Sequence, residues 1–482
     1  MATYTAAAGG GNWSDDATWG GSGHPVAGDV ALLDATSGAV TVDVNSACTT
    51  LDLTGYTSTL ALGTYALTVS GNVTIGTTVG SVATLTIGIS GGTGLTIGGD
   101  LLVALRGVIT CSGASKISCT GSWDVSAGTF TPSTGTVTFN ATASGKTIKS
   151  GSNTYYNVTW NGSGGEWTLQ DNFTQPRTTA FTLGTLILNG KTYTAGFGQT
   201  VTLGSGFTLT IGAGTLSAGD AMTVIIPTGA VVTISTGILS TSGLTVSGSG
   251  TFSATGAATI YCWRNLSISS ANFSAGISTF YQFYTAVATV YSNQPLYNYK
   301  VGRTDQNYDA VITMASNLVV LNNLTIQHYP GRTVSLVAST FTLTVGGNFA
   351  NGDVFNAGTG TVIFNDATKV TTVTGSTTFN VLRIETADKV VRFTAGTTQT
   401  VASFVATGTA GHPVILTNVS GTGTWALSDA SGTNRIYYCT ISYSAAAGGA
   451  AWLAYTSDGN VNGGSNTGWV FSSFNPLLIG GD

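Results

Sequence analysis

The sequence predicts an all-β protein, built as a parallel β-helix or β-solenoid with capped ends and an aromatic-rich middle region. The first observation is composition: 482 residues include 67 Gly and only 8 Pro, and charged residues make up 7%, against about 25% in ordinary domains. Threonine and valine favour strands, and glycine, serine and asparagine favour turns. Helix-forming residues are scarce. Aromatic residues at 10% and a mean hydropathy of +0.28 argue against disorder.

Internal repetition is the second observation. The segments 135–140 and 360–365 both end in Phe-Asn, and the segments 155–160 and 378–384 that follow them contain aromatic-Asn-Val. Weaker copies of the second strand occur at 263–268, 297–301 and 323–326. A chain that repeats one short strand–turn–strand unit is expected to stack that unit on itself.

The charge pattern bounds partners and location. The net charge is −5, and no run of Lys or Arg occurs, so nucleic acid is not an expected partner. No stretch reaches the roughly 18 apolar residues of a membrane span. Residues 1–5 lack the basic and apolar regions of a cleaved leader. These features together favour the surface of a virion released by lysis, or an extracellular or cell-surface location.

Residues 1–35 are expected to form an N-terminal cap or attachment segment. Trp13 and Trp19 precede a Pro-x-x-Gly-Asp segment (25–29) and an apolar strand. This pattern resembles the N-terminal segment of G8-type and related β-helix proteins, over about the first 75 residues. The resemblance implies a cap that covers the open end of a solenoid, where a strand edge would otherwise be exposed. A sugar-stacking role for the two indoles is the alternative, and burial is the commoner case.

Residues 36–260 are expected to form the first solenoid part. Apolar residues recur in alternate pairs, such as Leu51/Leu53 and Leu85/Ile87, separated by glycine-rich turns. Pairs every six to ten residues fit short strands on several faces of each coil. One residue of each alternating set points inward, and the threonines and serines between them point outward.

Residues 261–345 form the aromatic-rich middle region, read as wider coils with bulky filling or as an inserted lobe. Exposed tyrosines are enriched where proteins contact partners, although structural filling is the favoured reading. The candidate partner-contact residues are Tyr281, Tyr284, Tyr291, Tyr297 and Tyr308.

Residues 346–450 are expected to form the second solenoid part, and residues 451–482 the C-terminal cap and tail. The segment 458–471 resembles the closing segment of repetitive β-helix proteins from phages and bacterial surfaces. Trp469 and Phe471 would cover the last coil. The apolar tail, 474–482, is expected to dock on a neighbouring subunit.

Chemistry-bearing residues are sparse, and no catalytic, cofactor-binding or metal-binding residues are expected. Asp305–Asp309 spaces its oxygens like a calcium loop but lacks the glycine and the final carboxylate of that motif. Cys111 and Cys119 allow two readings, namely stacked neighbours in adjacent coils or buried small apolar residues, and the second is favoured. Asparagines at the strand starts are expected to hydrogen-bond along the axis: Asn157, Asn265, Asn298, Asn323 and Asn380.

The sequence therefore favours a non-enzymatic structural β-solenoid of a surface assembly. A phage virion component fits best: a capsid decoration, head fibre or tail-associated protein. The alternatives are a bacterial surface adhesin that binds glycans or a receptor through the aromatic region, and a polysaccharide-degrading β-helix enzyme. The expected partners are other virion or surface proteins and further copies of the chain, a trimer being one arrangement.

Overall fold

The computed structural model describes residues 1–78, 80, 82–88, 92–196, 200–218, 222–283, 287–303 and 309–472. Its regular structure is β throughout, apart from two short 3-10 helices in these residues, η1 (Asp16–Trp19) and η2 (Thr456–Asp458). None of the described helices has the length and apolar character needed to span a bilayer. Neighbouring strands pair in parallel in both compact units, which comprise Met1–Ser242 with Val246–Ala258, and Gly243–Thr245 with Thr259–Asp482. The all-β solenoid prediction is thus confirmed.

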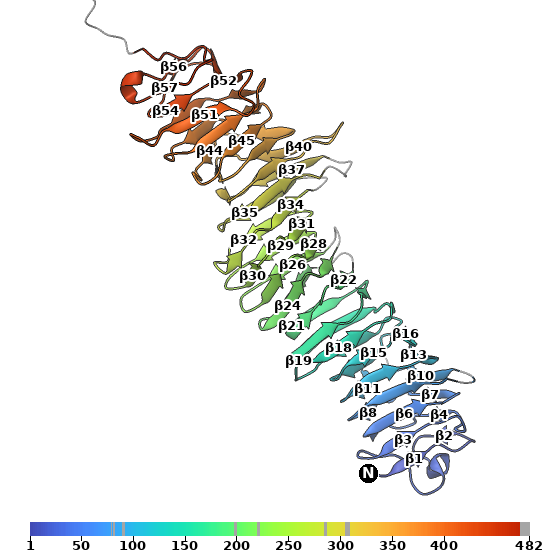
Figure 1. Ribbon diagram of the computed structural model, residues 1–482. Coiled ribbons are helices and arrows are strands. Elements are labelled where there is room, and N and C mark those ends of the chain that lie inside the picture. Colours follow the sequence, from blue (N-terminus) through green and yellow to red (C-terminus); the bar gives the residue numbers. More distant parts are fainter. Residues whose placement is uncertain are drawn as a thin grey trace, which may run out of the picture. The chain divides into compact units, whose positions relative to one another are not determined.

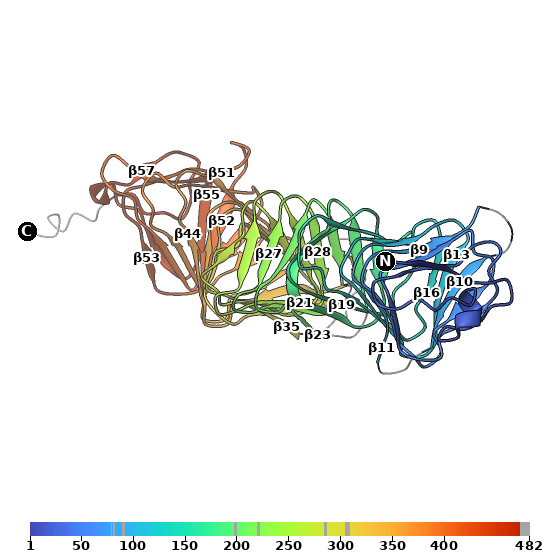
Figure 2. The ribbon, with the colours of Figure 1, turned by 90° about the horizontal axis from the view of Figure 1, so that it is seen from below.

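The first unit begins with three columns of stacked strands, and Figure 1 shows these rungs in order along the chain. Column one contains β1 (Thr3–Thr5), β3 (Val30–Leu32), β6 (Thr50–Thr54), β9 (Val73–Gly76), β12 (Leu101–Val103), β15 (Trp123–Asp124) and β18 (Lys146–Lys149). Column two contains β5 (Ser46–Cys48), β8 (Leu67–Val69), β11 (Thr93–Ile97), β14 (Lys116–Cys119) and β17 (Thr136–Phe139). Column three contains β2 (Gly11–Asn12), β4 (Val40–Thr41), β7 (Thr59–Ala61), β10 (Ala83–Ile87), β13 (Gly107–Cys111) and β16 (Thr129–Thr131); Figure 2 shows β10, β13 and β16 together.

Columns one and two merge in one long strand. The first half of β19 (Asn157–Leu169) pairs with β17, and its second half pairs with β18. From β19 the column continues through β21 (Thr179–Ile187), β24 (Phe207–Gly212), β27 (Val231–Ile234) and β30 (Thr251–Ala254). Two further columns of this unit contain β20 (Phe173–Gln175), β22 (Thr192–Ala195), β25 (Thr215–Ser217) and β28 (Ile238–Thr241), and β23 (Thr200–Thr202) and β26 (Thr223–Ile226). The residues of β29 (Gly243–Val246) divide between the two units.

The second unit has the same construction. Its longest column, here called the main column, contains β31 (Thr259–Cys262), β34 (Thr279–Gln282), β36 (Asn298–Val301), β39 (Leu324–Ile326), β42 (Phe349–Asn351), β45 (Thr371–Thr374), β48 (Val390–Phe393), β51 (Val414–Asn418), β54 (Cys439–Ile441) and β57 (Val461–Asn462). The second column contains β32 (Leu266–Ile268), β35 (Val287–Ser292), β37 (Ala310–Met314), β40 (Val334–Val337) and β43 (Val354–Asn356).

Shorter columns complete the second unit. One contains β38 (Leu318–Val320), β41 (Thr342–Val345), β44 (Thr361–Phe364), β47 (Val381–Ile384) and β50 (Ser403–Ala406). Another contains β46 (Thr377–Thr378), β49 (Thr398–Thr400), β52 (Trp425–Asp429) and β55 (Ser444–Gly448). The remaining strands are β33 (Phe273–Ser274) and the pair β53 (Thr433–Arg435) and β56 (Ala451–Leu453).

Strand alternation builds the core. In β10, Ala83, Leu85 and Ile87 are buried while the threonines between them are half-buried. Parallel pairing in register places Leu85 on Leu60 and Ile109 in the neighbouring rungs. The inward row is therefore apolar, and burial of each such side chain contributes about 1.5–3 kcal/mol.

The repeated motif is one whole coil rather than a short strand–turn–strand unit. Its two strands, β17 and β19, are consecutive rungs that pair from Thr136↔Asn157 to Phe139↔Trp160, and β18 lies between them in the chain. The second copy behaves in the same way, because β44 pairs with β47. The apparent turn in the sequence thus contains further strands on other faces of the coil.

A buried aromatic core fills the coils around β19. Trp160 contacts Phe139, Trp167, Phe173 and Tyr193. The other ring contacts of this core join Trp123 to Phe130, Phe139 and Tyr155, Phe130 to Tyr155, Tyr155 to Phe173, Phe173 to Tyr193, Phe181 to Tyr193 and Phe181 to Phe207. A cluster of aromatic side chains is therefore also present in the first unit. It lies in the coils where columns one and two merge.

The described residues of the middle region form rungs. Strands β31, β34, β36 and β39 pair successively in the main column, and β42 follows them. The five-part division of the chain expected from the sequence remains a prediction.

All five cysteines are buried, and none of them forms a disulfide. Cys111 ends β13 in column three and stacks on Ile87, whereas Cys119 ends β14 in column two and stacks on Ile97 and Phe139. They lie on different faces, so the reading of Cys111 and Cys119 as stacked neighbours in adjacent coils was wrong, and the reading as buried small residues is confirmed.

Candidate functional site

The strongest candidate site is the outward face of the main column from β31 to β45. Registered pairing generates two outward rows on this face. The first row contains Thr259, Thr279, Asn298, Asn323, Asn348 and Thr372, and the second contains Tyr261, Tyr281, Lys300, Thr325, Ala350 and Thr374. Neither row contains a carboxylate. We call this face the polar groove, because nine of its residues, from Thr279 to Thr374, line a depression of about 450 Å³.

Asparagines connect the rungs of the first row. The Asn298 Oδ1 accepts hydrogen bonds from the Asn323 backbone N–H (3.2 Å) and from the Asn322 side chain (2.9 Å). The Asn323 Oδ1 accepts from the Asn348 N–H (2.9 Å), and the Asn348 Oδ1 from the Thr372 N–H (2.8 Å). Each side-chain oxygen thereby satisfies a backbone donor of the following rung.

Aromatic rings and cations gather at the β31–β36 end of the groove. The rings of Tyr261 and Tyr281 lie 5.0 Å apart and are tilted by 37°. The Lys300 Nζ lies 3.3 Å from the Tyr281 hydroxyl oxygen, to which it donates, and 5.1 Å from the ring centre. The Arg303 guanidinium lies 4.7 Å from the centre of the Tyr261 ring. Cations over tyrosine faces are attracted by the negative potential of the ring.

The structure disperses the predicted partner-contact tyrosines. Tyr281 lies in the polar groove, whereas Tyr291 lies on β35 in the second column and is exposed. Tyr297 is half-buried next to β36, with the Lys369 Nζ 5.9 Å from its ring centre. Tyr284 and Tyr308 lie outside the described residues, as do Asp305 to Asn307 of the calcium-like segment and the tail from residue 473.

The predicted asparagine ladder exists in part. Asn298 and Asn323 occupy successive rungs of one row, and Asn348 extends the row. Asn157 bonds to the neighbouring coils through Thr134 and Thr178. Asn265 accepts from the Thr289 N–H, and Asn380 donates to the Gly360 carbonyl.

The predicted cap residues lie in the first and last coils of their respective units. Trp13 and Trp19 are buried with ring centres 4.9 Å apart, and the Trp19 Nε1 donates to the Trp13 carbonyl. Trp469 is buried against Trp452 at 5.2 Å and donates through Nε1 to Ser444, while Phe471 is half-buried. That these residues seal the ends remains a prediction.

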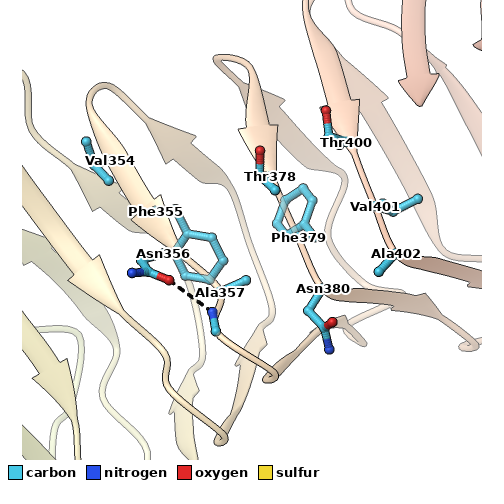
Figure 3. A pocket seen from close by; sticks show the side chains of 11 residues that line it. Val354, Phe355, Asn356, Ala357, Thr378, Phe379, Asn380, Thr400, Val401 and Ala402 are labelled. Atoms are coloured by element: carbon cyan, nitrogen blue, oxygen red, sulfur yellow. Dashed lines mark hydrogen bonds between the residues drawn. The ribbon is translucent and has the colours of Figure 1, made fainter. Parts of the chain in front are cut away.

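A second depression, of about 510 Å³, lies where β43 ends the second column and β46 begins another. Figure 3 shows the Phe355 and Phe379 rings between these strands, with ring centres 5.8 Å apart. Asn356 accepts a hydrogen bond from the Gly358 N–H at its rim. Both rings are buried, so this apolar notch is part of the core packing at the junction of two columns.

Several acidic side chains of the described residues hydrogen-bond to nearby turns. The Thr36 hydroxyl bond lowers the pKa of Asp34, and the Thr368 hydroxyl bond lowers that of Asp366. His24 and His412 contact Asp16 and Asp388 on the surface. Within the residues described, no three His, Cys, Asp or Glu side chains are grouped as a metal site would require.

Sequence reasoning missed Tyr261, Lys300 and Asn348 as members of one face. Their spacing of roughly one coil along the chain carries the signal, but coil lengths vary, since β34 to β36 spans 19 residues (298 − 279) and β36 to β39 spans 25 in the aligned row (323 − 298). A fixed repeat period therefore does not align them.

Comparison of the chain with protein-family models, with curated proteins and with solved structures gave no match. The structure assigns the chain to the parallel β-solenoid class of folds. The likeness of its ends to G8-type and phage β-helix proteins remains an expectation from the sequence.

Proposed function

We propose that the chain is a non-enzymatic structural component of a surface assembly. The observation that carries this proposal is that oxygens of outward polar side chains accept hydrogen bonds from backbone N–H groups of the next coil. The asparagine row of the polar groove is one example. Asn72, Asp100 and Ser122 in the first unit are another, each accepting from a backbone N–H one coil further on.

Such bonds resist separation of neighbouring coils. Each hydrogen bond from a backbone N–H to the neighbouring coil contributes about 0.5–1.5 kcal/mol to stability. The side-chain hydrogen bonds between coils stabilise the same contact. Parallel rungs also leave no free edge along the column. A load-bearing spacer uses these properties directly.

The ionisation of the acids supports a structural role. A general acid requires a raised pKa near neutral pH. Hydrogen bonds instead lower the pKa of Asp29, through the Ala2 N–H, and of Asp43, through the Ser14 hydroxyl. These carboxylates are held ionised as acceptors for neighbouring turns.

A phage particle is the assembly that we favour. The low charge, the hydroxyl-rich exterior and the resemblance of residues 458–471 to closing segments of phage β-helix proteins support a capsid decoration, head fibre or tail-associated protein. Other virion or surface proteins would then be the partners, with further copies of this chain.

Mass spectrometry of gradient-purified particles tests the location: peptides of this chain should co-sediment with capsid proteins. Recovery only from bacterial envelopes would overturn the virion assignment. Incubation of the purified chain with a panel of acidic and neutral polysaccharides tests the non-enzymatic assignment, and release of new reducing or unsaturated ends would overturn it.

A further inference from the structure

We propose that the polar groove binds an acidic oligosaccharide along the axis of the second unit. This adds a binding activity to the structural role and does not depend on it. The depression of about 450 Å³ lies along β34 to β45 of the polar groove, and Tyr261 extends the second row to β31.

The asparagine row supplies oriented donors. Of the two amide atoms of an asparagine side chain, only the oxygen can accept a hydrogen bond from a backbone N–H. The Asn348 N–H therefore orients the Asn323 oxygen toward the next rung, and the Thr372 N–H orients the Asn348 oxygen in the same way. The Nδ2 groups are consequently directed away from those bonds. In the described part of the chain, neither of these two Nδ2 groups has a protein acceptor. Two donors on successive rungs, ~4.8 Å apart, suit hydroxyl and carboxylate oxygens of a sugar chain.

The tyrosine end positions the Lys300 ammonium, which donates to the Tyr281 hydroxyl and lies over the Tyr281 ring. Tyr261 and Tyr281 are half-buried, so their rings are held by packing while part of each remains open to solvent. Stiff aromatic side chains lose little conformational entropy when they bind.

Charge selects the acidic class of sugar. The chain carries a net charge of −5, yet neither row of the groove contains a carboxylate, and the second row includes Lys300. Arg392 follows Thr372 in register in the first row, and Arg303 lies beside Tyr261. A carboxylate of a uronic or sialic acid would gain a charged hydrogen bond from the Lys300 ammonium, which is stronger than a neutral one. A neutral glycan lacks this contact.

Calorimetric titration with oligogalacturonate and with a neutral cello-oligosaccharide of equal length tests the inference. We expect saturable binding of the acidic probe only. Lys300→Gln and Tyr281→Ala should each weaken it about tenfold or more, and Lys300→Arg should retain most of the affinity. Near-ultraviolet circular dichroism checks that each variant keeps the native packing.

Two matched variants serve as controls. Lys191→Gln removes one positive charge from the first unit, and Tyr291→Ala removes an exposed tyrosine from the second column; both should leave affinity unchanged. Failure of the acidic probe to bind would overturn the proposal. So would an equal loss in Lys191→Gln and Lys300→Gln, which would indicate unspecific charge attraction. Neither result bears on whether the chain is found in purified particles, so the structural role is tested separately.

Discussion

The indole of Trp160 stacks on the ring of Phe139 in the preceding coil, with ring centres 4.5 Å apart and planes inclined by 24°. Strand register enforces this contact, because Phe139 and Trp160 are paired positions of β17 and β19. Both side chains are fully buried. In the first copy of the repeated motif, an aromatic stack thus joins consecutive rungs; in the second copy, β44 and β47 pair in the same way, with Arg383 opposite Ile363.

Replacement of Trp160 by alanine should lower the free energy of unfolding of the first unit by about 3–5 kcal/mol, because it leaves a large cavity. Trp160→Phe should cost clearly less, since it keeps a ring on Phe139. Hydrogen exchange of β17 and β19 is the appropriate measurement, because stacked repeats do not always unfold in one step. Equal protection in the alanine variant and the native chain would contradict the prediction.

The fold was predictable from the sequence because period-two alternation directly encodes which residues face the core. The inward positions of β10 and β13 could be identified in this way. The polar groove was not predictable, because Tyr261, Lys300 and Asn348 come together only through register, and register depends on coil lengths that differ from one coil to the next. The many aromatic residues in 261–345 correctly indicated Tyr281. They also suggested Tyr291 as part of the same cluster, although Tyr291 lies in another column.

Glycine is required at position 162 by close approach of two coils. A Cβ atom on Gly162 would lie 1.9 Å from the Ala141 carbonyl oxygen, whereas a Cβ on Gly113 would meet nothing within 4 Å. Gly162→Ala should therefore destabilise the first unit by about 3 kcal/mol or more, since backbone must move. Gly113→Ala should cost only about 1–2 kcal/mol, for its left-handed backbone. Chemical denaturation of the two variants compares them, and similar losses would contradict the steric argument.

Asp100 is one of the side chains of the first unit that accept a hydrogen bond from the backbone of the next coil. The Asp100 Oδ1 accepts a hydrogen bond of 2.7 Å from the Ser122 N–H. Asp100→Ala should cost about 1–2 kcal/mol and speed exchange of the Ser122 amide, because that donor loses its partner. Asp100→Asn retains an oxygen and serves as the matched control with a small effect. Slow exchange at Ser122 in both variants would show that the ladder bond is dispensable.

The cysteines should be inert in the native protein. Burial raises the pKa of Cys48, Cys111, Cys119, Cys262 and Cys439 to about 12, and the thiolate is the reactive form. At pH 8, a thiol-specific reagent should label none of them in the folded chain and all five after denaturation. Rapid labelling of any one before unfolding would identify a coil that opens locally.

Lys389 gives the protein a pH-dependent stability. Its side chain is fully buried, and its Nζ donates to the carbonyl oxygens of Gly346 (3.2 Å), Asp366 (2.7 Å) and Lys369 (2.9 Å). Burial lowers the pKa of Lys389 from 10.5 to about 8. Between these two values the unfolded chain holds a proton that the folded chain has lost, so this group makes the second unit more stable as pH rises.

The expected gain between pH 8 and pH 10.5 is on the order of 2–3 kcal/mol. The buried thiols act in the opposite sense, because they ionise first in the unfolded chain. The informative quantity is therefore the difference between the native protein and Lys389→Met, which keeps an unbranched side chain in the same space. Thermal unfolding from pH 7 to pH 10.5 should show native stability rising relative to this variant, whereas Lys191→Met should follow the native curve. Parallel curves for the native protein and Lys389→Met would mean that the lysine is charged in the folded state across the whole range, sustained by its three carbonyl partners.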